Sequence, residues 1–309
     1  MASPQPPTTV GVRVRVPAKI NLALKVGRPR RDGFHPLATV YQAVSLYDEV
    51  HAAWAEPDEF AVRVSGEGAE MVPPDDNNLA VRAARLLAET HGPHDSLGAQ
   101  LTIRKEIPVA GGLAGGSSNA AAALLACSVL WDLDVPPEAM RRLAAQLGSD
   151  VPFALLGGTA VGRGRGEEVM PALARGSYHW VLAFAHHGLS TPAVYRHFDQ
   201  LNPRAPQPVV PDDLMNALRS GDPALLGPAL SNDLESAALD LQPQLRRTLE
   251  TGRDYGALGA LVSGSGPTCA FLVGSESAAV DLSVTLSAEG VCRAVRRATG
   301  PVSGARLIP

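Results

Sequence analysis

The stretch "IPVAGGLAGGSSNAAAALLA", residues 107–126, joins a glycine-rich segment directly to an alanine-rich one. Alanine is the best helix former and glycine one of the poorest, so this junction predicts a loop followed at once by a helix that runs to about Trp131. The first four amide groups of a helix have no partner inside it, and with the helix dipole they carry about half a positive charge. Because glycines let the backbone approach a ligand closely, the junction predicts an anion site at the start of the helix.

The junction differs from two well-known phosphate-binding motifs. No Gly-Lys-Ser/Thr ends it, which excludes a Walker A loop, and it is not part of a first βα unit with the acidic residue of a dinucleotide fingerprint. An ordinary loop before a capped helix remains an alternative. The serine hydroxyls that follow the glycines could cap the helix, bind a phosphate oxygen or reach a metal ion, so Ser117 or Ser118 is the candidate metal ligand. The predicted phosphate-binding residues are Pro108, Val109, Ala110, Gly111, Gly112, Leu113, Ala114, Gly115, Gly116, Ser117 and Ser118.

The composition is that of a globular protein. The chain has 309 residues, of which 45% are hydrophobic and 19% charged, enough for one large domain or two ordinary ones. The net charge of -4 argues against a nucleic-acid-binding or membrane-binding surface. No run of about 18 apolar residues and no signal-like start occur, so we expect a cytoplasmic protein. The scattered cysteines, Cys127, Cys269 and Cys292, predict buried thiols rather than disulfides or a metal site.

Strand and helix patterns occur on both sides of the glycine-rich loop. Residues 10–16 and 20–26 alternate with period two and predict two strands, with Lys19 at the break between them. Helical patterns follow at 79–92 and 136–148, and a strand, a glycine turn and a second strand at 257–274. The succession of strands and helices predicts two α+β lobes with a cleft between them.

Three motifs together resemble the GHMP kinase superfamily. Residues 108–122 read P-x-x-x-G-L-x-G-G-S-S-x-A-A-A, "VPAKINLALKV" at 16–26 is similar to the first family motif, and "LVSGSGPTCAFLV" at 261–273 resembles the third. The resemblance implies a two-lobed α+β GHMP kinase fold, with an N-terminal ribosomal-protein-like α/β lobe, a C-terminal ferredoxin-like lobe and the active site in the cleft. It also implies ATP and Mg²⁺ as cofactors. We therefore expect a disordered tail over 1–9, an ATP-binding domain over 10–172 and a C-terminal domain over 173–309.

Two longer stretches point to one activity within the superfamily. Residues 31–50 and 147–167 resemble the members that phosphorylate the 2-hydroxyl of a cytidylated methylerythritol, in the non-mevalonate route to isoprenoid precursors. The resemblance makes Asp150 the general base and Lys19 a cation that keeps this carboxylate ionised. Asn21, two residues beyond Lys19 on the same strand face, could touch the polyol. From the residues alone, Asp150 could equally cap a helix and Lys19 could be exposed.

The cytidine end of the substrate has its own candidates. Phe34 can stack on the base and His35 can hydrogen-bond its edge. Many members of the family have tyrosine in place of Phe34, a change that keeps stacking and loses the phenol oxygen. Tyr195 could cover the base from the other lobe, or belong to the core. The turn residues Gly264, Ser265 and Gly266 are expected near the substrate diphosphate, although a simple hairpin turn is the alternative.

The leading hypothesis is thus a kinase for a small cytidylated polyol, without nucleic-acid or membrane partners, as a monomer or weak homodimer. One alternative is another GHMP kinase, such as a homoserine or mevalonate kinase. A second is a non-catalytic nucleotide-binding protein of the same fold. The presence of both Lys19 and Asp150 argues against the second alternative. The arginines of "GRPRRDG", residues 27–33, form either a solvated loop or a contact for an anionic ligand.

Overall fold

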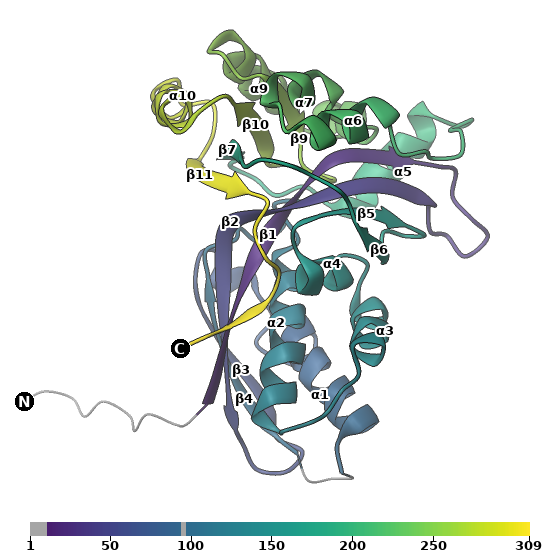
Figure 1. The fold of residues 1–309 in the computed structure, drawn as a ribbon, viewed down its shortest axis with the longest axis vertical. Coiled ribbons are helices and arrows are strands. Elements are labelled where there is room, and N and C mark those ends of the chain that lie inside the picture. The colour runs from purple at the N-terminus through teal and green to yellow at the C-terminus, as the bar shows by residue number, and fades with distance from the viewer. Residues whose placement is uncertain (1–10, 94–96) are drawn as a thin grey trace, which may run out of the picture.

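The computed structural model describes residues 11–93 and 97–309. The predicted tail over 1–9 lies outside these residues. Two sheets organise the described chain, one of eight strands and one of four, and helices pack on both, as expected for an α+β protein. Figure 1 shows the larger sheet with its helices in the lower part of the molecule and the smaller sheet with the later helices in the upper part.

The larger sheet is built on two long antiparallel strands, β1 (Gly11–Val26) and β2 (Leu37–Trp54). Their pairing runs from Gly11 opposite Ala53 to Val26 opposite Leu37, and the ribbon they form extends from the lower into the upper part of the molecule (Figure 1). The C-terminal strand returns to pair with β1, so both ends of the described chain lie in one sheet. The other strands of this sheet are β3 (Phe60–Gly66), β4 (Ala99–Lys105), β5 (Thr159–Arg163), β6 (Glu168–Pro171), β8 (Ser231–Asn232) and β12 (Arg306–Ile308).

The prediction of two separate strands at 10–16 and 20–26 is wrong, because β1 is continuous. Its pairing with β2 shifts register between Pro17 and Ala18 and again between Asn21 and Ala23. Proline cannot donate to a strand ladder, and a bulge accommodates it without ending the strand. Lys19 therefore lies inside a strand, between the two irregularities, and its side chain is buried rather than exposed.

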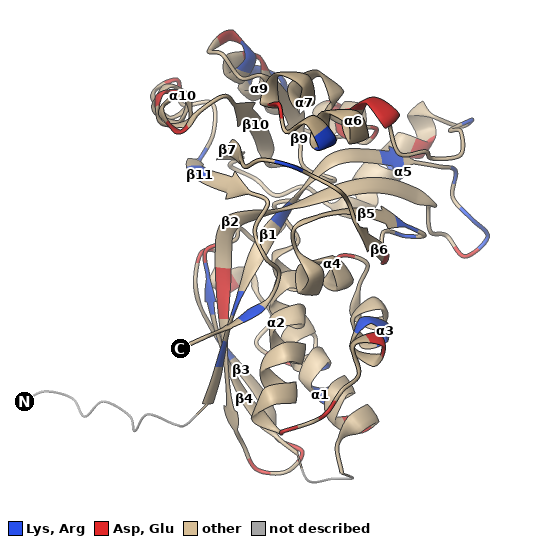
Figure 2. Cartoon of the chain, in the orientation of Figure 1, with Lys and Arg blue, Asp and Glu red and all other residues tan. Residues whose placement is uncertain are grey.

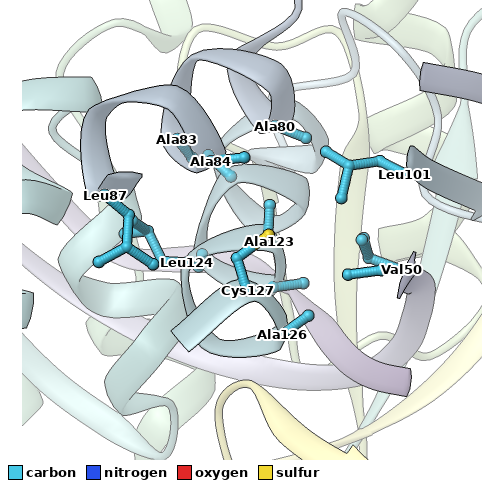
Figure 3. Close-up of a cluster of buried hydrophobic side chains, with 14 of the residues drawn as sticks. Val50, Ala80, Ala83, Ala84, Leu87, Leu101, Ala123, Leu124, Ala126 and Cys127 are labelled. Carbon is cyan, nitrogen blue, oxygen red and sulfur yellow. The ribbon is translucent and has the colours of Figure 1, made fainter. Parts of the chain in front are cut away.

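Three helices pack on one face of the larger sheet, α1 (Leu79–His91), α2 (Gly115–Leu130) and α4 (Val151–Leu156), and α3 (Pro137–Leu147) packs on these helices. The side chain of Asn78 caps α1 by accepting from the Ala80 amide. In α2, alanines fill the buried face and let the helix approach α1 and the sheet closely, as predicted. Figure 3 shows Ala123, Leu124 and Cys127 of α2 packed among residues of α1, β2 and β4. This packing fixes the start of α2 relative to the sheet.

The smaller sheet has the strand order β11–β7–β10–β9, with all neighbours antiparallel. Trp180 on its β7 is fully buried and donates through Nε1 to Gln42 Oε1 on β2, 2.9 Å away, which ties the two sheets together. The strands are β7 (Tyr178–Phe184), β9 (Gly259–Val262), β10 (Cys269–Val273) and β11 (Ala294–Gly300), and the helices are α5 (Thr191–Leu201), α6 (Asp212–Ser220), α7 (Pro223–Ala229), α8 (Glu235–Leu241), α9 (Gln244–Asp254) and α10 (Glu276–Ala288).

The expectations for cysteines and membranes can be compared with the described chain. The cysteines are buried free thiols, as predicted, and burial raises the pKa of the Cys127, Cys269 and Cys292 thiols. Within residues 11–93 and 97–309, no cluster of three or more His, Cys, Asp or Glu side chains is arranged to hold a metal ion. The helices of the described chain are all too short or too polar to cross a bilayer.

Candidate active site

A cleft of about 870 Å³ is lined by β1, β2, the glycine-rich loop, the residues before α4, and α5 with the β9–β10 turn from the C-terminal part. Most predicted site residues line this cleft; Leu113, Ser118 and Gly266 do not. The predicted residues that do line it are Lys19, Asn21, Phe34, His35, Pro108, Val109, Ala110, Gly111, Gly112, Ala114, Gly115, Gly116, Ser117, Asp150, Tyr195, Gly264 and Ser265.

The glycine-rich loop ends at the open N-terminus of α2. No side chain caps this helix, whose N-cap residue is Ala114, so its first amides are not satisfied by the usual cap hydrogen bond. Ala110 and Ala114 both have positive φ, 54° and 61°, a backbone conformation that costs an alanine about 1 kcal/mol or more. Strain of this kind is characteristic of ligand-binding loops. The loop therefore has the geometry of an anion site.

The β9–β10 turn braces the glycine-rich loop from the other side. A Cβ atom on Gly112 would lie 2.2 Å from the Ser263 carbonyl oxygen, so only glycine fits at this crossing. Ser263 Oγ donates to the Gly112 carbonyl at 3.3 Å, and the Thr268 amide donates to the Gly111 carbonyl at 3.3 Å. The two glycine motifs thus lie side by side, although about 150 residues separate them in sequence.

The two candidate serines at the start of α2 face different ways. Ser118 is buried, and its Oγ donates to the Pro17 carbonyl of β1 at 2.9 Å. Ser117 lines the cleft. Of the two hydroxyls, that of Ser117 is therefore the one placed to contact a ligand or an ion, while that of Ser118 joins the helix to the sheet.

Beneath the loop lies a buried ion pair that the sequence analysis missed. Lys105 Nζ contacts Asp48 Oδ2 and lies 3.2 Å from Asn119 Oδ1, and the Asn119 amide donates to Asp48 Oδ2 at 2.7 Å. The other carboxylate oxygen accepts from the amides of Glu106 and Ile107, where the loop begins. The alternation along β4 could have revealed this lysine, because position 105 has the parity of the buried positions 101 and 103.

Lys19 and Asp150 form the centre of the cleft. Lys19 Nζ lies 3.8 Å from Asp150 Oδ2, 2.7 Å from Asn21 Oδ1 and 3.0 Å from the Gly112 carbonyl oxygen. Burial lowers the pKa of Lys19, and the Asp150 carboxylate opposes this shift. Asp150 precedes α4, yet its side chain makes no cap hydrogen bond. Its carboxylate therefore lines the cleft and does not cap the helix.

Tyr41 is a third member of this centre, and the sequence offered no signal for it. Its hydroxyl donates to Asp150 Oδ1 at 3.1 Å, and its ring stacks on Phe153 with centroids 4.8 Å apart. Burial, followed by the Asp150 charge, raises the pKa of Tyr41 well above its ordinary value. The phenol is therefore neutral and able to donate throughout the physiological pH range, which leaves Asp150 Oδ2 open toward the cleft.

We expect Tyr41→Phe to lower kcat by about 10-fold to 100-fold, because a hydrogen bond to a charged group contributes about 1.5–3 kcal/mol. Steady-state kinetics should show an unchanged KM for ATP. Tyr47→Phe is a matched control on the same strand, since the Tyr47 ring lies against Arg15 and Arg306 and does not line the cleft. Equal kcat values for the two variants would remove Tyr41 from the centre.

Aromatic side chains gather at the other end of the cleft. His35 Nε2 lies 2.8 Å from Asp199 Oδ1, and its ring centroid lies 4.9 Å from that of Tyr195 on α5. Burial raises the pKa of Tyr195, and Asp150 adds to this shift. Phe34 is 51% exposed on the β1–β2 hairpin, so part of its ring is accessible for stacking beside Arg165, whose Cζ lies 4.9 Å from the ring centroid. The sequence analysis missed Asp199, whose carboxylate bonds His35 Nε2 and so orients the imidazole ring.

Two family models match the chain: the GHMP kinase N-terminal domain over residues 78–158 and the GHMP kinase C-terminal domain over 214–292. The chain belongs to the GHMP kinase family. A curated relative of this GHMP kinase, the 4-diphosphocytidyl-2-C-methyl-D-erythritol kinase of Mycolicibacterium smegmatis, is 55% identical over 98% of this chain and 94% of its own. The protein of the same name from Mycobacterium tuberculosis is 52% identical over 97% and 94%.

Solved structures agree with this family assignment. A crystal structure of 4-(cytidine 5'-diphospho)-2C-methyl-D-erythritol kinase has a TM-score of 0.75 and 34% identity, and the match covers 93% of this GHMP kinase and 98% of that chain. A homoserine kinase from Cytophaga hutchinsonii has a TM-score of 0.74 at 19% identity, over 99% and 100%, which shows a shared fold. The predicted family is confirmed, and with it the use of ATP.

Proposed function

We propose that this GHMP kinase transfers the γ-phosphate of ATP to the 2-hydroxyl of 4-diphosphocytidyl-2-C-methyl-D-erythritol, a step of the non-mevalonate route to isoprenoid precursors. One observation carries the proposal. The Lys19–Asp150–Tyr41 centre lies in one cleft with the open start of α2 and with the aromatic end formed by Phe34, His35 and Tyr195. The names of the full-length relatives support the same substrate.

The nucleotide side of the cleft supplies positioning and charge. The amides at the start of α2 are donors for the phosphates of ATP, and the positive end of the helix dipole favours their negative charge. The β9–β10 turn and the buried Asp48–Lys105 pair hold the loop from two sides, so that it needs no rearrangement when the nucleotide binds. Phosphoryl transfer depends mainly on such positioning.

Asp150 manages the proton of the acceptor alcohol. The hydroxyl oxygen forms a bond to the γ-phosphorus while the bond from that phosphorus to the β–γ bridging oxygen breaks and ADP leaves. The hydroxyl proton passes to the Asp150 carboxylate, whose Oδ1 already accepts from Tyr41. The Lys19 ammonium lies 3.8 Å from Oδ2, where its positive charge faces the carboxylate that receives the proton.

The site fits a magnesium ion held mostly by the nucleotide. Mg²⁺ keeps several waters and usually takes one or two protein oxygens together with substrate phosphates, so the lack of an acidic cluster in the described chain is no obstacle. The Ser117 hydroxyl, which lines the cleft, is the oxygen we expect to contribute. When bound, the ion would neutralise charge on the β- and γ-phosphate oxygens.

A coupled ADP-release assay tests the proposed substrate. We expect turnover with the cytidylated methylerythritol and background rates with homoserine or mevalonate, because neither of these has a base for the aromatic end of the cleft. Turnover with one of the latter, and none with the cytidylated compound, would identify a different GHMP kinase. ATP binding without turnover of any of the three would identify a non-catalytic protein.

Gly116→Val tests the nucleotide loop. A Cβ atom at Gly116 meets only the Leu79 Cδ1 atom, at 3.6 Å, so added methyl groups would stand over the helix start without disturbing the fold. We expect the KM for ATP to rise by about 10-fold to 100-fold, a loss of about 1.4–2.8 kcal/mol, with a small change in the KM for the alcohol.

Gly274→Val is the matched control for this variant. Gly274 is also exposed, and a Cβ there meets only Leu258 Cδ1 at 3.7 Å, but the residue lies outside the cleft. The control should retain the wild-type KM for ATP. An unchanged KM in Gly116→Val as well would place the triphosphate somewhere other than the start of α2.

A further inference from the structure

The turn between β5 and β6 lies against the catalytic centre. The Gly166 carbonyl oxygen is 3.5 Å from the Tyr41 hydroxyl oxygen. A Cβ atom at Gly166 would lie 2.4 Å from the Tyr41 hydroxyl oxygen. That hydroxyl bonds Asp150. The neighbouring Arg165 extends toward the aromatic end of the cleft, where its Cζ lies 4.9 Å from the centroid of the Phe34 ring. The β5–β6 turn therefore reaches from the catalytic centre, which Gly166 contacts, to the aromatic end, where the guanidinium of Arg165 lies against Phe34.

Glu167 orients Arg165 and leaves part of its guanidinium available. Arg165 Nε donates to Glu167 Oε1 at 3.1 Å, and the Arg165 amide donates to Glu167 Oε2. Among the described residues, neither terminal nitrogen of Arg165 makes a hydrogen bond, and the ion pair with Glu167 is made through Nε. The side chain is 34% exposed and lines the cleft, so these nitrogens can reach a bound ligand.

Other cations near this position are less suitable for a ligand anion. The Lys19 ammonium is buried and already contacts Asn21, the Gly112 carbonyl and Asp150. Arg196 also lines the cleft, but it is exposed on α5 (Thr191–Leu201). Figure 2 shows basic residues in the β5–β6 turn and also in the loop that joins β1 to β2. Arg165 is thus the partly buried cation with uncommitted donors at this level of the cleft.

We propose that Arg165 binds the diphosphate group of the cytidylated substrate, an inference that rests on the function proposed above. In this substrate the diphosphate stands between the base and the polyol. With the base at Phe34 and His35 and the hydroxyl at Asp150, a cation between them meets the diphosphate. The planar guanidinium presents paired N–H donors that match phosphate oxygens, and one edge of it remains for them after the Glu167 contact.

Arg165→Met removes the charge and keeps the length of the side chain. We expect the KM for the cytidylated substrate to rise by about 10-fold to 100-fold, the range of a hydrogen-bonded charge contact. The kcat and the KM for ATP should stay within about twofold, since the variant touches neither Asp150 nor α2. Arg163→Met is the matched control, because Arg163 is exposed on the same hairpin and does not line the cleft.

Calorimetric titration with CDP and with cytidine separates the diphosphate contact from an effect on the Phe34 ring, and it needs no turnover. The wild type should bind CDP more tightly than cytidine, and Arg165→Met should weaken CDP binding by about 10-fold to 100-fold and cytidine binding by less than about twofold. Equal weakening of both ligands, no weakening, or a wild type without preference for CDP would overturn the proposal. A wrong substrate assignment would show itself separately, as missing turnover by the wild type.

Discussion

We expect Asp150→Asn to lower kcat by about 10²-fold to 10⁴-fold, because the variant loses its general base. The KM for ATP should stay within about twofold of the wild-type value. Asparagine has nearly the same shape as aspartate and can still accept the Tyr41 hydrogen bond, so the geometry of the cleft persists. It cannot take up the proton of the acceptor alcohol. Lys19 lies between Asp150 and the carbonyl of Gly112 in the glycine-rich loop, and the substitution changes neither Lys19 nor this loop.

The same variant has a second expected consequence, at Lys19. Burial lowers the pKa of this lysine, and the Asp150 charge is what raises it, so the pKa falls further when Asp150 becomes neutral. A titration of Lys19 by nuclear magnetic resonance measures this shift. Asp134→Asn, an exposed change between α2 and α3, is the control and should alter neither kcat nor the Lys19 titration. Near-normal turnover of Asp150→Asn would exclude Asp150 as the base.

The features of the site that the sequence predicted are local in the chain. The loop and helix at 107–126 follow from the chemistry of glycine and alanine, and α1 agrees with the helical pattern at 79–92. The Lys19–Asp150 pair was different. No local pattern joins residues so far apart, and only the resemblance to a known family brought them together. Family likeness thus supplied long-range contacts that composition and periodicity could not.

What the sequence missed depends on partners far along the chain. Tyr41 lies within a run of buried residues of β2, positions 38–44, as a core residue would, and its partner Asp150 is 109 positions away. A break was predicted between residues 16 and 20, but pairing with β2 continues on both sides of it, so the strand is continuous. Residues 147–167 showed a family resemblance but no role for Arg165, which the turn after β5 places in the cleft.

Asp48→Asn should lower the free energy of unfolding by about 3–5 kcal/mol, the cost of removing one member of a buried ion pair. The Asp48 side chain is fully buried and accepts four hydrogen bonds, from Lys105, Asn119 and the amides of Glu106 and Ile107. An asparagine has one acceptor oxygen for these donors, and its NH₂ group would face the remaining donors without accepting from them. Urea unfolding measures the loss as a lower midpoint with an unchanged slope.

The comparison with Glu49→Gln decides whether burial is the cause. Glu49 is the next residue on β2 and pairs with Arg15, but both side chains are about one-third exposed, so its loss should cost less than about 1 kcal/mol. The double variant Asp48→Asn with Lys105→Met removes both buried charges, and we expect it to be less destabilised than the sum of the single changes. Since Glu106 and Ile107 open the glycine-rich loop, Asp48→Asn should also raise the KM for ATP. A cost below about 1 kcal/mol with an unchanged KM would mean that this ion pair does not support the loop.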